Sequence, residues 1–270
     1  MINAERMLPI AVALLAAAAR PVLAEEAAAA EQPGSWFPGT FTGTVALNND
    51  YIFRGISQTD HNPAIQGSIN YTLDTGFYGT SVYGGVWGSN LDFNDDQANN
   101  NHGAHLELDW TFGFTGNILD TGIGYTLGAI YYDYPGARNG LSYNYWEFAP
   151  ALTYAVNDWL SLNGGLNYSP DYFGGSGEGF YPNGGVTVKI PVPNNWFALS
   201  AFGMTGHQWI EHNSKFGTDD YQDWKLGLTV GIKNITLTAA YTDTSLDKHE
   251  CFGGTNLCGA RALLSLGAAF

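Results

Sequence analysis

Hydrophobic and polar residues alternate along most of the chain. In residues 63–73 the odd positions carry apolar side chains such as Ile65 and Ile69, and the even positions carry mostly polar ones. A period of two is that of a β-strand with one apolar and one polar face. The same alternation is clear in 41–53, 105–115, 221–233 and 234–242, and weaker in 76–88, 119–132, 143–155, 159–168, 179–190, 196–206 and 260–270. The pattern predicts an all-β fold of about twelve strands.

The connections between these strands alternate in length. The long ones are 54–62, 89–104, 133–142, 169–179, 206–220 and 243–259, and the short ones are 74–76, 115–118, 157–158, 191–195 and 233–234. Short periplasmic turns and long extracellular loops are typical of an outer-membrane barrel. The alternative is a soluble β-sandwich or lipocalin-like barrel, which does not require this alternation. We therefore predict a transmembrane up-and-down antiparallel β-barrel.

Composition agrees with a membrane barrel. The 16 Tyr, 15 Phe and 8 Trp together outnumber the 10 basic and 25 acidic residues. Charged residues make up 13% of the chain, whereas a soluble domain has about 25%. The net charge of -15 repels phosphate and argues against a nucleic-acid partner. After the N-terminal region, no apolar run reaches the length of a transmembrane helix, but strands hide their hydrophobicity in alternation.

Aromatic residues gather near both ends of the predicted strands, where a barrel carries its interfacial girdles. The alternative is that aromatic residues are simply frequent in strands. The predicted outer girdle comprises Tyr51, Phe53, Tyr131, Tyr132, Tyr134, Tyr143, Trp146, Tyr221 and Trp224. The predicted inner girdle comprises Tyr71, Tyr78, Trp110, Phe114, Trp159 and Trp196.

The two ends of the chain carry export and assembly signals. The apolar run 8–19 follows Arg6 and predicts a signal peptide over residues 1–24. Residues 25–39 then form a flexible periplasmic lead-in, and residues 40–270 form the barrel of a bacterial outer-membrane protein. The last strand has apolar residues at alternate positions and resembles the signal that the barrel-assembly machinery reads, with Leu264, Leu266 and Phe270 as its main residues.

A family resemblance lies in the first three predicted strands. The segment 49–59 (NDYIFRGISQT), the following PAIQG at 63–67 and GVWGSN at 85–90 resemble the opening of the TorF-type porins. The resemblance implies a proteobacterial outer-membrane barrel that acts as a channel. The loop with two cysteines lies outside the pattern of this family.

Motifs for catalysis or metal binding are weak. Cys251 and Cys258 predict a disulfide in an oxidising compartment, with a metal site that includes nearby His249 as the alternative. The segment 207–212 (HQWIEH) has one residue too many for an inverted zincin motif, and 92–103 lacks the glycine and glutamate of a calcium loop. Nucleophile elbows and phosphate loops are absent from the sequence. We expect no enzymatic activity, no cofactor and no metal.

The charged residues expected inside the barrel are the main candidates for function. By alternation they are Asp50, Arg54, Glu107, Asp109, Glu147, Lys189, Asp223, Lys225 and Arg261. In a water-filled lumen these charges would select solutes. In a blocked lumen they would pair in salt bridges, so that Arg54→Ala would chiefly lower stability. Acidic outer loops would favour cations, through Asp92, Asp95, Asp96, Asp219 and Asp220.

We favour the water-filled lumen and expect passive diffusion of small polar solutes or ions, with mild cation selectivity. One alternative is a non-conducting barrel whose extracellular loops bind a partner, and another is a barrel phospholipase. The expected partners are outer-membrane lipid and lipopolysaccharide, the barrel-assembly machinery and small polar solutes.

Overall fold

The computed structural model describes residues 38–93, 103–119, 121–138, 140–193 and 196–270. The predicted signal peptide, most of the lead-in, and Asp95 and Asp96 lie outside the described residues.

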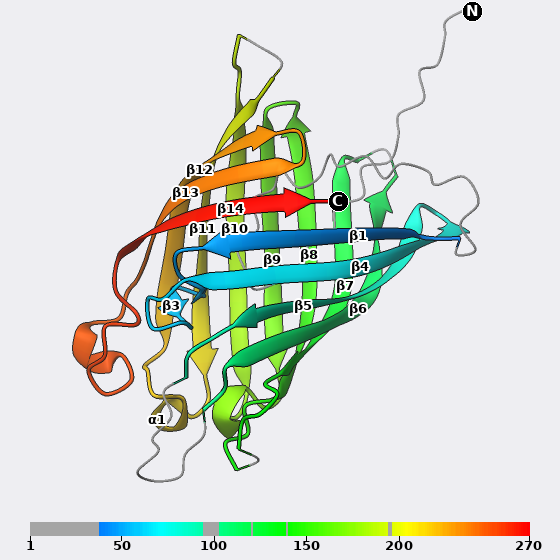
Figure 1. Cartoon of the computed structure of the whole chain (residues 1–270). Helices are drawn as coiled ribbons and strands as arrows, with labels where there is room; N and C mark the ends of the chain where they lie inside the picture. The colour runs from blue at the N-terminus through cyan, green and yellow to red at the C-terminus, as the bar shows by residue number, and fades with distance from the viewer. Residues whose placement is uncertain (1–37, 94–102, 120, 139, 194–195) are drawn as a thin grey trace, which may run out of the picture.

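Within these ranges the strands close into a twelve-stranded antiparallel barrel, which confirms the predicted fold (Figure 1). Neighbouring strands follow chain order, and β1 pairs with β14 to close the ring. The wall consists of β1 (Thr40–Asn48), β4 (Ala64–Phe77), β5 (Thr80–Asn90), β6 (Leu106–Ile118), β7 (Ile123–Asp133), β8 (Tyr145–Asn157), β9 (Leu160–Ser169), β10 (Gly179–Ile190), β11 (Ala198–Ile210), β12 (Tyr221–Ile232), β13 (Ile235–Thr244) and β14 (Arg261–Ala269).

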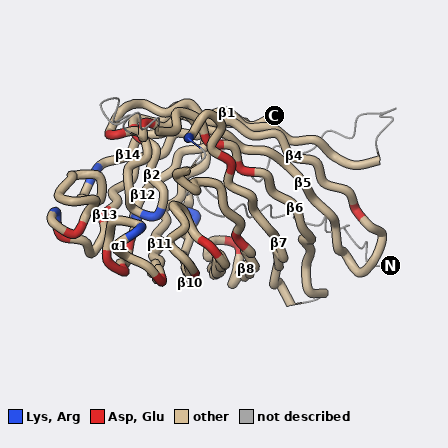
Figure 2. The backbone as a smooth tube through the Cα atoms, turned by 90° about the horizontal axis from the view of Figure 1, so that it is seen from below, with Lys and Arg blue, Asp and Glu red and all other residues tan. Residues whose placement is uncertain are grey.

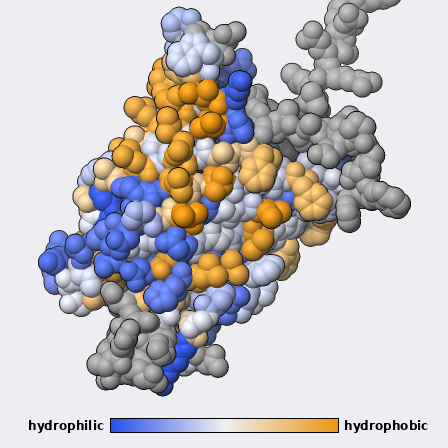
Figure 3. All heavy atoms as spheres, viewed as in Figure 1, coloured by the Kyte–Doolittle hydropathy of each residue, from blue (hydrophilic) through white to orange (hydrophobic). Residues whose placement is uncertain are grey.

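The outer surface of the barrel is apolar. Leu266 pairs with Leu47 on one side and Leu237 on the other, and all three side chains are about half exposed. Apolar side chains cover much of the visible barrel wall, and hydrophilic ones gather toward the end with the long loops (Figure 3). An exposed apolar surface of this extent marks contact with a partner or a membrane, and in a closed barrel it is the lipid-facing band.

The helices of the described residues are short: η3 (Phe173–Gly175), α1 (Asn213–Phe216) and η4 (Lys248–Glu250). Each falls short of the length and apolar character that a membrane-crossing helix needs.

The first predicted strand differs from the structure at its outer end. β1 stops at Asn48, and the chain then turns into the barrel, where β2 (Ile52–Phe53) and β3 (Ile56–Ser57) form a small hairpin. Tyr51 and Phe53 are 2% and 8% exposed, so their placement in an outer girdle was wrong. Alternation continues through this segment because the hairpin is itself extended chain.

The other predicted girdle residues differ in burial, and Tyr71, Tyr131, Tyr143 and Trp224 are half-buried. Tyr132, Tyr134 and Tyr221 are also buried, and their placement in the outer girdle was wrong as well. Trp146 and Trp110, in contrast, are exposed at outward positions of the wall, as is Phe114, and Tyr78, Trp159 and Trp196 are exposed in the short connections. The structure therefore keeps aromatic residues at the inner end of the wall and moves several of the outer ones into the interior.

The lipid-facing role of the wall can be tested with neighbouring residues of β14. Leu266→Arg places a cation in the apolar band and should lower the free energy of unfolding by about 2 kcal/mol. Ser265→Arg is the control, because Ser265 faces the interior between Asn48 and Thr238. Urea titration of both variants in lipid vesicles measures the difference. Equal effects of the two substitutions would contradict a lipid-facing Leu266.

Candidate functional site

The β2–β3 hairpin lies inside the barrel and turns at Arg54 and Gly55. Both turn residues have positive φ, 46° and 80°, which is typical of a tight two-residue hairpin turn. A Cβ on Gly55 would clash with Cγ2 of Thr244 and would lie 2.9 Å from Cβ of Asp223. Glycine is therefore required both for the backbone conformation and for the close approach to the wall.

The tip of the hairpin is fixed by a buried ion pair. The Nη2 atom of Arg54 donates to both carboxylate oxygens of Glu147, at 2.8 and 2.7 Å, and Nη1 donates to Oε1 of Gln208 at 2.7 Å. The side chains of Arg54 and Glu147 are 2% and 1% exposed. Glu147 is on β8, across the barrel from β1, where the hairpin segment begins. The arginine thus reaches the opposite wall.

Aromatic rings surround the guanidinium. Its carbon lies 4.3 Å from the ring centre of Tyr181, 4.7 Å from that of Phe53 and 5.8 Å from that of Tyr172. These distances allow cation–π attraction, which is strongest away from water. Burial is the largest single effect and lowers the pKa of Arg54. The Glu147 carboxylate and the neighbouring tyrosines Tyr172, Tyr132 and Tyr145 together raise it by more, so the pKa lies above its ordinary value and the side chain stays charged.

The carboxylate of Glu147 also accepts hydrogen bonds from residues of the barrel wall. Tyr132 donates its hydroxyl at 3.0 Å and Asn167 its amide at 2.9 Å, both to Oε2. On the other side of the hairpin segment, the hydroxyl of Tyr51 donates to Glu107 at 3.1 Å. Buried charges are tolerated when they are paired and hydrogen-bonded. Arg54 and Glu147 meet this condition except at Nε of Arg54, which has no hydrogen-bond partner.

A second group of polar contacts holds the base of the hairpin. Asp50 accepts hydrogen bonds from Ser57 at 2.7 Å and Thr59 at 2.9 Å, and it pairs with Arg261 at 3.0 Å. His61 also contacts Asp50, at 3.4 Å. The base is therefore attached to β14 as well as to its own loop.

The predicted disulfide between Cys251 and Cys258 is present, in the loop between β13 and β14. This bond corrects the alternative in which the cysteines bind metal. His249 instead lies beside Asp247 and Glu250, whose side chains form the capping box of η4. That capping explains why the carboxylates of Asp247 and Glu250 are close together.

The interior around the hairpin is filled by a cluster of buried side chains: Tyr51, Phe53, Ala64, Trp87, Leu91, Ala104, Ile130, Tyr132, Tyr134, Tyr145, Ala149, Tyr172 and Ile210. The outer half of the lumen therefore differs from the water-filled interior that we favoured from the sequence. A twelve-stranded barrel has a wider interior than an eight-stranded one, and the hairpin with its aromatic neighbours occupies that space.

The nine charged residues that the sequence predicts to face the interior all lie on the interior side of the barrel. Four of them form two ion pairs, Arg54 with Glu147 and Arg261 with Asp50. Asp223 accepts from Tyr181 at 2.8 Å, and Glu107, Asp109 and Lys225 are buried in the same outer half. Lys189 is exposed near the inner end of β10 and does not join this cluster.

Sequence reasoning missed the uncharged members of the site. Gln208, Tyr132, Tyr181 and Asn167 occupy inward positions of their strands, so alternation combined with hydrogen-bonding capacity could have identified them. Tyr172 lies in a connection between β9 and β10 and carries no such signal. In Figure 2 the charged positions gather around β2 and the loops beside it.

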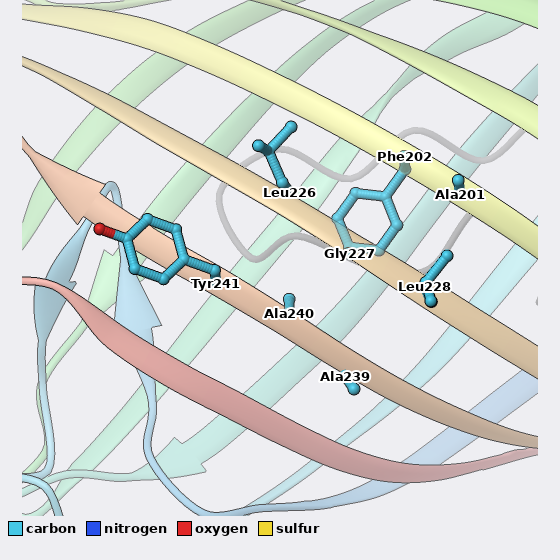
Figure 4. Close-up of a pocket in the computed structure, with 8 residues that line it drawn as sticks. All are labelled: Ala201, Phe202, Leu226, Gly227, Leu228, Ala239, Ala240 and Tyr241. Carbon is cyan, nitrogen blue, oxygen red and sulfur yellow. The ribbon is translucent and has the colours of Figure 1, made fainter.

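A recess on the barrel wall is separate from this site. It lies where β11, β12 and β13 carry small residues, and Figure 4 shows its lining of Ala201, Phe202, Leu226, Gly227, Leu228, Ala239, Ala240 and Tyr241. Five of these side chains take the outward positions of their strands. The recess is part of the apolar outer surface and holds none of the charged residues.

A closed antiparallel barrel with an apolar exterior and a polar, charged interior defines the class of membrane-spanning β-barrels. A family model described as bacterial protein of unknown function (Gcw_chp) matches residues 31–270, so the chain belongs to this family. The TorF-type assignment is not confirmed. No curated protein matches the sequence.

Solved structures share the barrel architecture at low identity. The NanC porin has a TM-score of 0.47 and 10% identity, over 86% of this chain and 99% of that one. The outer membrane channel DcaP of Acinetobacter baumannii has a TM-score of 0.46 and 12% identity, over 86% of this chain and 97% of that one. CdiB from Escherichia coli has a TM-score of 0.46 and 11% identity. The match covers 87% of this chain, which spans only 63% of the length of CdiB. Values this low carry no information on activity.

The Arg54–Glu147 pair makes a prediction about stability. Arg54→Ala leaves Glu147 buried without its cation and should lower the free energy of unfolding by about 3 to 5 kcal/mol. Glu147→Gln in the same chain should restore part of that loss, because the buried charge is removed. A double-mutant cycle by urea titration measures the coupling. A coupling below about 0.5 kcal/mol would show that the two side chains act independently.

Proposed function

We propose that the chain is a porin-like channel of the bacterial outer membrane that is closed in the described state by the β2–β3 hairpin. It passes small polar solutes or ions when the hairpin leaves the lumen. The observation that carries this proposal is the Arg54–Glu147 pair, which joins the hairpin tip to the opposite wall. The solutes diffuse passively, and the proposal includes no catalytic step.

The inner half of the barrel supports a conducting role. Inward positions near the short connections carry uncharged polar side chains that are partly exposed, among them Asn117, Thr153, Asn163 and Thr236. A barrel that served only as a sealed wall would have no need of a polar, accessible surface there. Pore linings of this kind let hydrated solutes pass without strong binding.

The acidic surface at the mouth sets the expected selectivity. Asp219 and Asp220 are exposed in the loop between β11 and β12, and the chain carries a net charge of -15. A negative mouth raises the local concentration of cations. We therefore propose mild cation selectivity for the open state.

A second candidate function is a permanently closed barrel whose extracellular loops bind a partner. The buried aromatic cluster around the hairpin favours it, because withdrawal of the hairpin would expose apolar surface to water. The two candidates differ in one respect, which is whether the hairpin moves.

Export and membrane contacts form part of the same proposal. The signal peptide directs the chain out of the cytoplasm. The alternating apolar residues of β14, including Leu264 and Leu266, and Phe270 directly after the strand are exposed on the outer surface and available to the barrel-assembly machinery. The rest of the outer surface contacts membrane lipid and lipopolysaccharide.

Single-channel recording tests the proposal. The refolded wild-type chain in a planar bilayer should be closed most of the time. The double variant Phe53→Ala/Arg54→Ala should raise the open probability at least about tenfold, since a loss of about 1.4 kcal/mol in the contacts of the hairpin is enough for that.

Phe148→Ala is the matched control, because Phe148 is exposed on the outer surface of β8. It should leave the open probability unchanged. Silence of the double variant, with its barrel still folded by circular dichroism, would overturn the channel and favour the closed barrel. Anion preference in the reversal potential would overturn the proposed cation selectivity alone.

A further inference from the structure

The loop that contains the disulfide lies directly against the base of the hairpin. The backbone amide of Ser57 donates to the carbonyl oxygen of Leu257 at 2.9 Å. The Nε2 atom of His61 lies 3.1 Å from Oδ1 of Asn256. Both Asn256 and Leu257 lie between the two cysteines in the sequence. The hairpin and this loop are thus joined by backbone and side-chain contacts.

The disulfide itself packs on the hairpin. Ile56 is in one buried cluster with Cys251, Cys258, Leu246 and Tyr221. Ile56, Cys251 and Cys258 are almost completely buried. Removal of the hairpin would therefore expose the disulfide and one side of this cluster to water, which costs free energy in proportion to the apolar area.

Arg261 joins the two segments electrostatically. Its Nη1 atom donates to Asp50 at 3.0 Å, while Nη2 donates to the carbonyl oxygens of Asn256 at 2.8 Å and Leu257 at 2.7 Å. One guanidinium thereby fixes both the base of the hairpin and the loop between the cysteines. Planar, forked donors of this kind hold a defined geometry better than a single ammonium does.

The end of β13 adds a shared contact. Oγ1 of Thr244 donates to the carbonyl oxygen of Cys258 at 2.7 Å. The same threonine is the residue that leaves no room for a Cβ at Gly55. The turn of the hairpin and the end of the disulfide loop therefore pack on opposite parts of one side chain.

The disulfide limits how far the loop can move. The cysteines are seven positions apart, so the bond closes a short ring. This ring contains Asn256 and Leu257, the two loop residues that contact the hairpin segment. A cross-link restricts the open conformations of a loop more than the closed one. Without it, the loop would separate from the hairpin by local unfolding more often.

We propose that the disulfide-closed loop is a latch that holds the hairpin inside the barrel and must move before the hairpin can leave. Only the effect of the latch on conductance rests on the proposed function, because release of the latch opens the channel if the lumen conducts. The latch itself concerns the position of the hairpin and can be measured without current.

The test uses a cysteine reporter inside the hairpin. Ile52 is 6% exposed and lies in β2, so Ile52→Cys should react with a membrane-impermeant maleimide only when the hairpin leaves. In the chain that also carries Cys251→Ser and Cys258→Ser, the reaction rate should rise roughly tenfold over the chain with the disulfide intact. Lys248→Ser is the matched control in the same loop and should leave the rate unchanged.

A second variant keeps the disulfide and removes the hydrogen bonds of Arg261 to Asp50 and to the loop between the cysteines. Arg261→Gln should also raise the reaction rate of the reporter, which guards against a folding defect of the serine variants. Reaction rates that stay at the wild-type level in both variants would overturn the latch. Faster reaction without any single-channel current would support the latch and overturn the channel. Faster reaction together with a higher open probability would support both.

Discussion

A single buried arginine governs the arrangement of the barrel interior. Arg54 is held in the turn of a hairpin with positive φ on both residues, and its guanidinium is almost completely buried. A charge in that position is stable only with an opposite charge and filled hydrogen bonds. Glu147 provides the opposite charge, Glu147 and Gln208 accept hydrogen bonds from the two Nη atoms, and three aromatic rings surround the guanidinium. The hairpin, the far wall and the aromatic cluster therefore depend on one interaction.

The same interaction explains how a twelve-stranded barrel is filled. Its interior is too wide for the wall side chains of the outer half alone to occupy, and a segment of chain enters instead. The charges that enter with it, Asp50 and Arg54, find partners on β14 and β8. The inner half has uncharged polar residues, and of the nine charged residues predicted to face the interior all but Lys189 lie near the long loops. Closure is thus local to one end of the barrel.

Much of the fold could be predicted from the sequence because alternation and loop length are local signals. They identified the twelve wall strands and the inward charges, and the two cysteines of an exported chain identified the disulfide. The hairpin was missed because extended chain alternates in the same way in the wall and inside the lumen. Tyr51 and Phe53 were assigned to a girdle for that reason. The partner of Arg54 could not be predicted, because Glu147 lies across the barrel and the alternation within each strand does not show which strands face each other.

The measurement that tests the account most directly is the hydrogen exchange of the Arg54 guanidinium, observed by nuclear magnetic resonance of the folded chain with labelled arginine. Hydrogen bonds of Nη1 and Nη2 to Gln208 and Glu147 predict slowly exchanging Nη protons, and Glu147→Gln should accelerate their exchange. Exchange as fast as that of free arginine in the wild-type chain would contradict a hairpin fixed across the lumen.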